Sequence, residues 1–327
     1  MYNAHDTSNY NTQLIDIKDC LTLQQVDDKL QGFLDTAEKV PLYHYYDHPE
    51  TTTHHAQFDS FGSHQGLRNS RTHTPYGVCT KKYELIQNKE AFQSLEHLVT
   101  AGDAHFDKAA IWGNGASTYL TVCNKATTVS YTNDSLQQIN DPVKNNLFAL
   151  NDQSGSWALN FGNHIIRMFC LNQLPSMSGW LKNKVTFKHT ATSKNKIAAI
   201  NELTKDSCYA FDKTIETYET LASSHMTSGT FGTFAETLLN NTWGDAYETI
   251  EPDEGTYQYR LLPRRAKKIE DLTKLYLSRN QDAGFTRWGA LQAVTAWRDH
   301  NPRISYLSNL RGASKSLKTE ALRLLLN

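Results

Sequence analysis

Residues Leu147–Thr190 contain the clearest strand signals in the chain and read LFALNDQSGSWALNFGNHIIRMFCLNQLPSMSGWLKNKVTFKHT. Three apolar stretches in this segment are strand candidates: Leu147–Leu150, Ser156–Phe161 and His164–Leu171. The residues between them, NDQSG and GN, are of the types that form tight turns. The segment therefore predicts an antiparallel meander.

After this segment, near Lys196, the spacing of apolar residues changes from two residues to about 3.6, which is the helical period. The predicted helical face consists of Ile197, Ile200, Leu203, Phe211, Ile215, Tyr218 and Leu221, and Gly229 is expected to end this helical segment. Further helices are predicted at residues 231–241, 263–280, 286–300 and 313–326, with Pro263 in a first turn. Because strands come first and helices follow, the sequence predicts an α+β fold.

The N-terminal region begins with a polar lead-in. Apolar residues from Leu23 to Ala37 recur at helical spacing, and Thr22 with Gln25 can form a capping box. Pro41 is expected to stop this helix. These patterns predict an N-terminal helix and lead-in at 1–40, an antiparallel sheet core at 41–195, and a helical region at 196–327 packed on that core, with one single domain as the alternative.

Two further elements are predicted between the lead-in and the central segment. Residues 76–87 alternate well enough for a strand pair, and Asn88 is expected to cap a helix that ends at Gly102. Residues 109–130 predict a hairpin interrupted by the triplet GNG. No phosphate-binding GxGxxG or GxxxxGK[ST] motif is completed there, so the triplet indicates a turn.

Residues 41–75 have no sustained apolar period but contain six histidines: His44, His48, His54, His55, His64 and His73. A metal site is one interpretation, because imidazole is a common metal ligand. However, the segment has no HExxH or carboxylate-supported spacing, and a flexible polar loop explains its composition equally well. We therefore predict no metal and no cofactor.

Composition sets the broad class. Apolar residues make up 39% and aromatic residues 11% of the 327 residues, which is enough for a folded core. The five scattered cysteines contain no CxxC pair, which is typical of reduced thiols in a cytosolic protein. The polar N-terminus does not resemble a signal peptide, and no apolar run is long enough to cross a bilayer. We expect a cytoplasmic protein without membrane contact.

Charge is distributed unevenly. Residues Gln153–Asn201 contain no Asp or Glu but six basic residues, so this run carries +6 while the rest of the chain, whose total is −1, carries −7. Such an asymmetry favours an anionic partner. A second basic segment, RLLPRRAKK at 260–268, follows an acidic patch from Asp245 to Glu254, and these two are expected to neutralise each other across a loop.

Four segments, in order, resemble the phage/plasmid-like protein family that is catalogued as domain of unknown function 932. They are THTPYGVCTKKYELIQNKEAFQSLEHLV, LNDQSGSWALNFGNHIIRMFCLNQL with Arg167, Cys170 and Asn172, FKHTATSKNKIAAINEL with Lys188, His189 and Thr190, and FTRWGALQAVTAWRDHNPR with Trp288, Ala293, Asp299 and His300. The resemblance covers about residues 40–327. It implies an α+β fold, carriage by phages or plasmids, and a location in the host cytoplasm.

The chain departs from the family pattern at two places. The family's His-Asp-Gly is replaced by Asp152-Gln153-Ser154-Gly155, and its paired valines are Met168 and Phe169. A catalytic role for that family histidine or aspartate would therefore not carry over to this chain.

Enzymatic alternatives have weak sequence support. Cys170 with His164 or His189 could form a nucleophile and base, because a thiolate needs a nearby imidazole or cation. However, Cys170 lies in the apolar stretch HIIRMFC, which predicts a buried, unreactive thiol. Asp299 and His300 could form an acid–base pair, but a helix end favours a capping role. The sequence assigns no catalytic residue.

Single-stranded nucleic acid is the partner that the acid-free run favours. Phosphates need Lys or Arg, and unpaired bases need aromatic faces. In LKNKVTFK the alternation places lysines on one face and Val185 with Phe187, a candidate core residue, on the other. The predicted binding residues are Arg167, Lys182, Lys184, Lys188 and His189; the alternative for Arg167 is an internal ion pair.

Annealing or binding of single strands in recombination or replication is the expected role. A protein-interaction or host-inhibitor role without catalysis is the alternative, and a nucleic-acid-processing enzyme is a third. A homo-oligomer is compatible with each of them.

Overall fold

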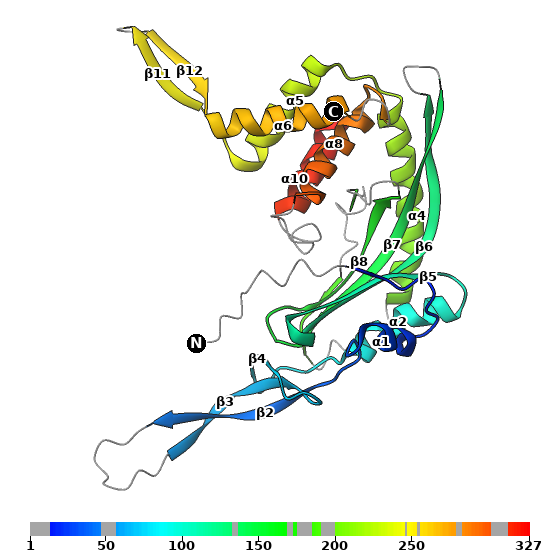
Figure 1. The fold of residues 1–327 in the computed structure, drawn as a ribbon, viewed down its shortest axis with the longest axis vertical. Helices are drawn as coiled ribbons and strands as arrows, with labels where there is room; N and C mark the ends of the chain where they lie inside the picture. The colour runs from blue at the N-terminus through cyan, green and yellow to red at the C-terminus, as the bar shows by residue number, and fades with distance from the viewer. Residues whose placement is uncertain are drawn as a thin grey trace. The chain divides into compact units, whose positions relative to one another are not determined.

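A computed structural model describes residues 14–46, 57–132, 137–168, 173–174, 185–190, 200–245, 247–253, 256–278, 283–301 and 313–327 (Figure 1). Antiparallel sheets occupy residues 15–187, and helices dominate from residue 200 onward, which confirms the predicted α+β fold. No helix among these residues is both long enough and apolar enough to cross a membrane.

The main sheet has the strand order β1-β5-β6-β7-β8-β10, with β9 also paired to β8. Its strands are β1 (Ile15–Asp16), β5 (His105–Trp112), β6 (Ser117–Thr132), β7 (Gln138–Asp152), β8 (Leu159–Arg167), β9 (Gln173–Leu174) and β10 (Val185–Phe187). The predicted meander is therefore present, but the two candidates after residue 155 form the single strand β8. Gly162 and Asn163 lie inside it, because GN can continue an extended strand as well as form a turn.

The chain divides into two compact units. Unit 1 comprises Met1–Asn124, Asn146–Asn163 and Asn183–Asp206, and unit 2 comprises Lys125–Asn145, His164–Lys182 and Ser207–Asn327. The divisions fall inside β6, β7 and β8, so sheet strands contribute residues to both units. Each unit has its own apolar core.

The core of unit 1 lies between the sheet and two helices, α1 (Leu23–Leu30) and α2 (Asn88–Thr100), which both pack on β5. The rings of Phe33 and Phe92 stack at 5.0 Å in this core. Strands β5 and β6 form the predicted hairpin, and a short turn at Gly113–Gly115 connects them. Phe187 of β10 is 5% exposed, which confirms it as a core residue.

A smaller sheet in unit 1 has the order β2-β3-β4, built from β2 (Ala37–Tyr46), β3 (Gln57–Asn69) and β4 (Pro75–Thr80). Figure 1 shows β2 and β3 extending beyond β4 as a two-stranded arm. The prediction of a flexible loop at residues 41–75 is therefore wrong for 41–46 and 57–69, which are strands, and residues 47–56 lie outside the described ranges.

The first helix is shorter than predicted. The Thr22–Gln25 capping box is present, but the helix ends at Leu30 and Gln31 has φ 47°, outside the helical range. Pro41 does not stop a helix; it lies in β2 beside a bulge, on an edge strand where proline costs no ladder hydrogen bond. Asn88 also does not cap α2, since the cap position is Gln87.

The predicted strand pair at 76–87 contains one strand, β4, because residues after Thr80 leave the sheet. Residues 81–87 form the connection between β4 and α2.

Unit 2 packs its helices around one core. They are α4 (Ile200–Ala222), which belongs to unit 2 from Ser207 onward, α5 (Ser228–Trp243), α6 (Pro263–Ser278), α8 (Arg287–Asp299) and α10 (Ala313–Leu326). The rings of Phe231 and Tyr276 stack at 4.2 Å, and Trp288 lies 4.8 Å from Tyr218, between ring centroids. The predicted helices are confirmed, except that α4 ends at Ala222 and Gly229 lies in the first turn of α5.

The acidic and basic segments before α6 form a hairpin that the sequence did not predict. It consists of β11 (Tyr247–Asp253) and β12 (Thr256–Leu261). Figure 1 shows it projecting from the point where α6 begins. The Arg260 guanidinium pairs with the Glu248 carboxylate across the two strands, so the expected neutralisation occurs at this position.

Candidate nucleic-acid interface

Arg167, a predicted binding residue, is buried in unit 2 with only 3% of its surface exposed. Its Nε donates to Asp141 Oδ2 at 2.6 Å and to Oδ1 at 2.8 Å, and Asp141 is 0% exposed. The indole Nε1 of Trp288 also donates to Asp141 Oδ2, at 3.1 Å. The internal ion pair considered as an alternative for Arg167 is therefore what the structure contains.

His189, in unit 1, is also buried, at 6% exposed. Its ring stacks on Tyr83 with centroids 4.7 Å apart. Burial lowers the pKa of this imidazole, and the nearby Asp152 carboxylate partly opposes that shift. The side chain is placed to support the fold rather than to meet a ligand at the surface.

The predicted lysines lie outside this buried group. Lys188 directly follows β10 and is exposed, as the alternation predicted, with Phe187 turned inward. Lys182 and Lys184 fall outside the described residues. Among the predicted binding residues, Lys188 is therefore the described one whose charge is at the surface.

Asp152, in the segment that replaces the family's His-Asp-Gly, organises the turn after β7. Its carboxylate accepts hydrogen bonds from Ser117 Oγ at 2.7 Å, from Ser154 Oγ at 2.8 Å and from the Trp157 backbone N–H at 2.9 Å. The Tyr83 hydroxyl donates to the Asp152 carbonyl oxygen at 3.4 Å. Segments that carry the family resemblance thus meet around a buried carboxylate with a structural role.

The described residues give little support to the catalytic pairs considered from the sequence. Asp299 forms a buried ion pair with Lys318 at the end of α8, and His300 is exposed. His164 is buried, and Cys170 lies outside the described residues. No group of three or more metal-ligating side chains occurs in the described part of the chain. The side chains of His44, His48, His54 and His55 fall outside it.

The strongest surface candidate is a basic–aromatic cluster in unit 2, which we define as Trp243, Trp297, Arg264, Arg265, Lys268 and Arg298. Its residues come from the C-terminal end of α5, the first turns of α6 and the last turn of α8, which pack against one another. Pro263 starts α6 as predicted, so the basic residues that follow it fall on its first two turns.

Two half-buried indoles form the aromatic part of the cluster. Trp243 and Trp297 have ring centroids 6.2 Å apart. Lys268 Nζ lies 4.1 Å from the centroid of Trp243, and the Arg298 guanidinium carbon lies 5.5 Å from that of Trp297. These are cation–π distances, so the rings help to hold the cations in place.

Arg265 is the buried member of the cluster and connects two helices. It is buried, and it donates to Asn240 Oδ1 at 3.3 Å and to the Gly244 carbonyl oxygen at 3.0 Å. Gly244 ends α5 with φ 76°, a backbone conformation that favours glycine. This contact joins the end of α5 to the start of α6.

The cations around Lys268 repel one another, while Asp299 is the acid near Arg298. Burial lowers the pKa of the Lys268 ammonium, and Arg265, Arg298 and Arg264 lower it further by repulsion. Neither Arg264 nor Lys268 makes a hydrogen bond or ion pair with any residue that the structure describes. A bound anion would relieve this repulsion.

Two other lysines of α6 have acidic partners. Lys267 pairs with Glu270 and Asp271, and Lys274 pairs with Glu270. The sequence expectation that the basic segment 260–268 is neutralised by the acidic patch therefore holds for Arg260 but not for the cluster. The sequence analysis missed these residues because the order of charges along the chain does not show which cations pair with which acids.

Comparison with known families now adds one fact. The family described as a domain of unknown function, DUF932, matches residues 75–324. The chain belongs to this family. The match confirms the resemblance seen in the sequence, and the DUF932 region includes the basic–aromatic cluster, Asp141 and Arg167. No curated protein matches the chain. No solved structure matches it either.

Replacement of Arg167 in the DUF932 region with Ala should lower the free energy of unfolding by about 3–5 kcal/mol, because it leaves the Asp141 charge buried without its ion-pair partner. Urea denaturation followed by circular dichroism measures this loss. Lys213→Ala, which removes an exposed ion pair with Glu216, is the control and should cost less than about 1 kcal/mol. Equal stability of the two variants would contradict the structural role of Arg167.

His189 should make the DUF932 region less stable in acid. Its pKa is lower in the folded state than in the unfolded chain, so the unfolded chain binds more protons as pH falls below about 6.5. The free energy of unfolding should then fall with a slope of up to about 1.4 kcal/mol per pH unit for this group. Urea denaturation at several pH values between 5 and 8 tests this on the parent and on His189→Gln.

The His189→Gln variant should lose that part of the slope, whatever its stability at neutral pH. Lys188→Ala alters the exposed neighbour and should keep it. An unchanged slope in His189→Gln would show that other groups cause the acid sensitivity.

Proposed function

We propose that this DUF932 protein binds single-stranded nucleic acid and that the basic–aromatic cluster contacts the strand. The observation that carries the proposal is the position of Lys268 over Trp243, among arginines, with no carboxylate partner in the described residues. A phosphate backbone is an anion that repeats along a strand, so it can neutralise several cations of one cluster.

The tryptophans favour a single strand over a duplex. Unpaired bases stack on aromatic side chains and on guanidinium planes, while bases within a duplex already stack on each other. Trp243 and Trp297 are partly exposed, and the Arg298 guanidinium lies over Trp297. The cluster thus combines stacking faces with cations, which is the combination that sequence-tolerant strand binding requires.

Lys182, Lys184 and Lys188 are proposed as a second contact region. The acid-free run that contains them supports this, as does the exposure of Lys188. Arg167 and His189, predicted with them, are buried, so we assign their effect on binding to the stability of the fold.

The proposed role is binding or annealing of single strands during recombination or replication of a phage or plasmid, in the host cytoplasm. The family resemblance supports this setting. If the following tests fail, the alternative is a protein-interaction or host-inhibitor role without strand binding.

The double variant Arg264→Ala/Lys268→Ala tests the cluster. If both side chains contact phosphates, the salt dependence of binding to a single-stranded oligonucleotide should fall by about 0.7 per contact, or about 1.4 in total, on a log–log scale. Fluorescence anisotropy across a salt series measures this slope. Binding should weaken for all base sequences alike, because phosphate contacts carry no sequence information.

Lys267→Ala/Lys274→Ala is the matched control, since it removes the same charge from the same helix. Both of these lysines pair with acids of α6, so their loss should change the slope much less. Equal effects of the two double variants would point to net charge alone. Absence of oligonucleotide binding by the parent at low salt would refute the proposed function.

The triple variant Lys182→Ala/Lys184→Ala/Lys188→Ala tests the second region. Its salt slope should fall by about two, at roughly 0.7 per phosphate contact, with little change in the free energy of unfolding. Anisotropy and urea denaturation on the same preparation check both expectations. A folded triple variant with the parent's slope would remove these lysines from the interface and leave the cluster untouched.

A further inference from the structure

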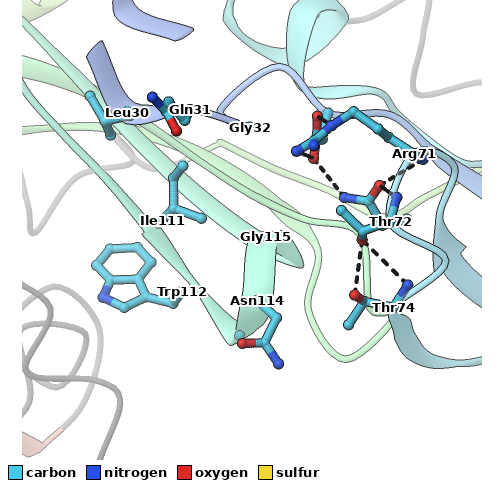
Figure 2. Close-up of a pocket in the computed structure, with 13 residues that line it drawn as sticks. Leu30, Gln31, Gly32, Arg71, Thr72, Thr74, Ile111, Trp112, Asn114 and Gly115 are labelled. Atoms are coloured by element: carbon cyan, nitrogen blue, oxygen red, sulfur yellow. Dashed lines mark hydrogen bonds and ion pairs between the residues drawn. The ribbon is translucent and has the colours of Figure 1, made fainter. Parts of the chain in front are cut away.

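Unit 1 contains a pocket of about 420 Å³ where three turns meet (Figure 2). The turns follow α1, connect β3 to β4, and connect β5 to β6. A volume of this size lies within the usual range for small-molecule sites. It is separate from the basic–aromatic cluster, which consists of residues of unit 2.

Backbone strain is concentrated at this pocket. Within the described residues, the non-glycine residues with positive φ are Gln31 (47°), His73 (58°) and Asn114 (56°). Gln31 and Asn114 line the pocket, and His73 lies between two lining residues, Thr72 and Thr74. Such conformations cost free energy, and they persist where the surrounding structure holds them for a function.

Two of the turns, β3–β4 and β5–β6, are held in place by specific contacts. Asn69 Oδ1 accepts hydrogen bonds from the backbone N–H groups of Arg71 at 2.8 Å and Thr72 at 2.9 Å. At Gly115 a Cβ atom would lie 2.7 Å from the Tyr76 hydroxyl oxygen, so only glycine allows this approach. The pocket is therefore built before any ligand arrives.

One wall of the pocket is apolar and the other is polar. Figure 2 shows Ile111 and Trp112 on one side, and Arg71, Thr72 and Thr74 on the other. The polar wall has no net charge, because Arg71 Nη2 pairs with Asp35 Oδ2 at 2.8 Å. A strongly charged ligand is therefore not the best fit.

Two amide side chains remain available for recognition. The side chains of Gln31 and Asn114 make no hydrogen bond with any residue in the described ranges. Both side chains are exposed, and each amide offers both a donor and an acceptor, so either one suits a neutral group whose edge presents donors and acceptors side by side. Leu30 and Ile111, which are partly exposed, provide apolar surface for a flat ring, whereas Trp112 is only 2% exposed.

We propose that this pocket binds a nucleobase. A base is a neutral flat ring with donors and acceptors along its edge, and carboxamide side chains recognise such edges through paired hydrogen bonds. The base can come from a free nucleoside or from an unstacked position in a single strand, and the two sources share this chemistry. The inference does not rest on the basic–aromatic cluster.

Isothermal titration of the full chain with adenosine, guanosine, cytidine and uridine tests the proposal, with ribose as the sugar control. At least one nucleoside should bind, and ribose should not. Asn114→Gly and Gln31→Gly should each weaken that binding about tenfold, because each removes an amide while glycine keeps the backbone conformation without strain. Circular dichroism verifies that both variants are folded.

His73→Gly is the matched control. It places glycine at a third positive-φ position beside the pocket, but the His73 side chain does not line it. Its nucleoside affinity should equal that of the parent. Loss of affinity in this variant equal to that in the other two would attribute the effect to backbone changes and overturn the proposal.

Competition between the bound nucleoside and a homopolymer of the same base identifies the source. Displacement by the oligonucleotide supports a base within a strand, and its failure supports a free nucleoside. Failure of every nucleoside to bind at millimolar concentration, or equal binding of ribose, would overturn the nucleobase assignment. Either result leaves the salt-dependent binding by the cluster as a separate question.

Discussion

The Asp141 carboxylate is the buried charge on which unit 2 depends. It is fully removed from solvent, and Arg167 from β8 and Trp288 from α8 both stabilise it by donating to it. A carboxylate in this position would be strongly unfavourable without such partners. The contact therefore joins the sheet strands to α8. It brings together Arg167 and Trp288, which lie far apart in sequence and both belong to segments that resemble the DUF932 family.

Unit 1 follows the same rule with neutral groups. Asn88, at the start of α2, donates to the Phe33 carbonyl oxygen at 2.9 Å and accepts from Thr118 at 2.8 Å and Asn151 at 2.9 Å. Buried amides and hydroxyls cost free energy unless they pair, so these contacts fix how the helix sits on the sheet. Asp152 does the same for the turn after β7. These buried polar side chains thus serve the fold rather than a reaction.

The proposed binding surfaces, by contrast, contain polar or charged side chains without a partner among the described residues. On α6, Lys267 and Lys274 have carboxylate partners on their own helix, whereas Lys268 and Arg264 have none among the described residues. Because the cations of the cluster repel one another, a bound anion is favourable there. The cluster can therefore attract phosphate although the protein as a whole is not basic. The nucleobase pocket of unit 1 shows a related principle, because its amides are held by strained turns before they have a partner.

The sequence by itself determined the α+β class, the hairpin at 109–130, the helices from residue 200 onward and the alternation that exposes Lys188, because each of these follows from the local spacing of apolar residues. It also carried the family resemblance. Only the tertiary structure decided that residues 41–75 contain an arm, that Arg167 and His189 are buried, and that Trp243 meets Lys268 of α6 while Trp297 meets Arg298 of α8. Burial and pairing depend on residues distant in the chain, and local periodicity contains no information about which of those distant residues a side chain will meet.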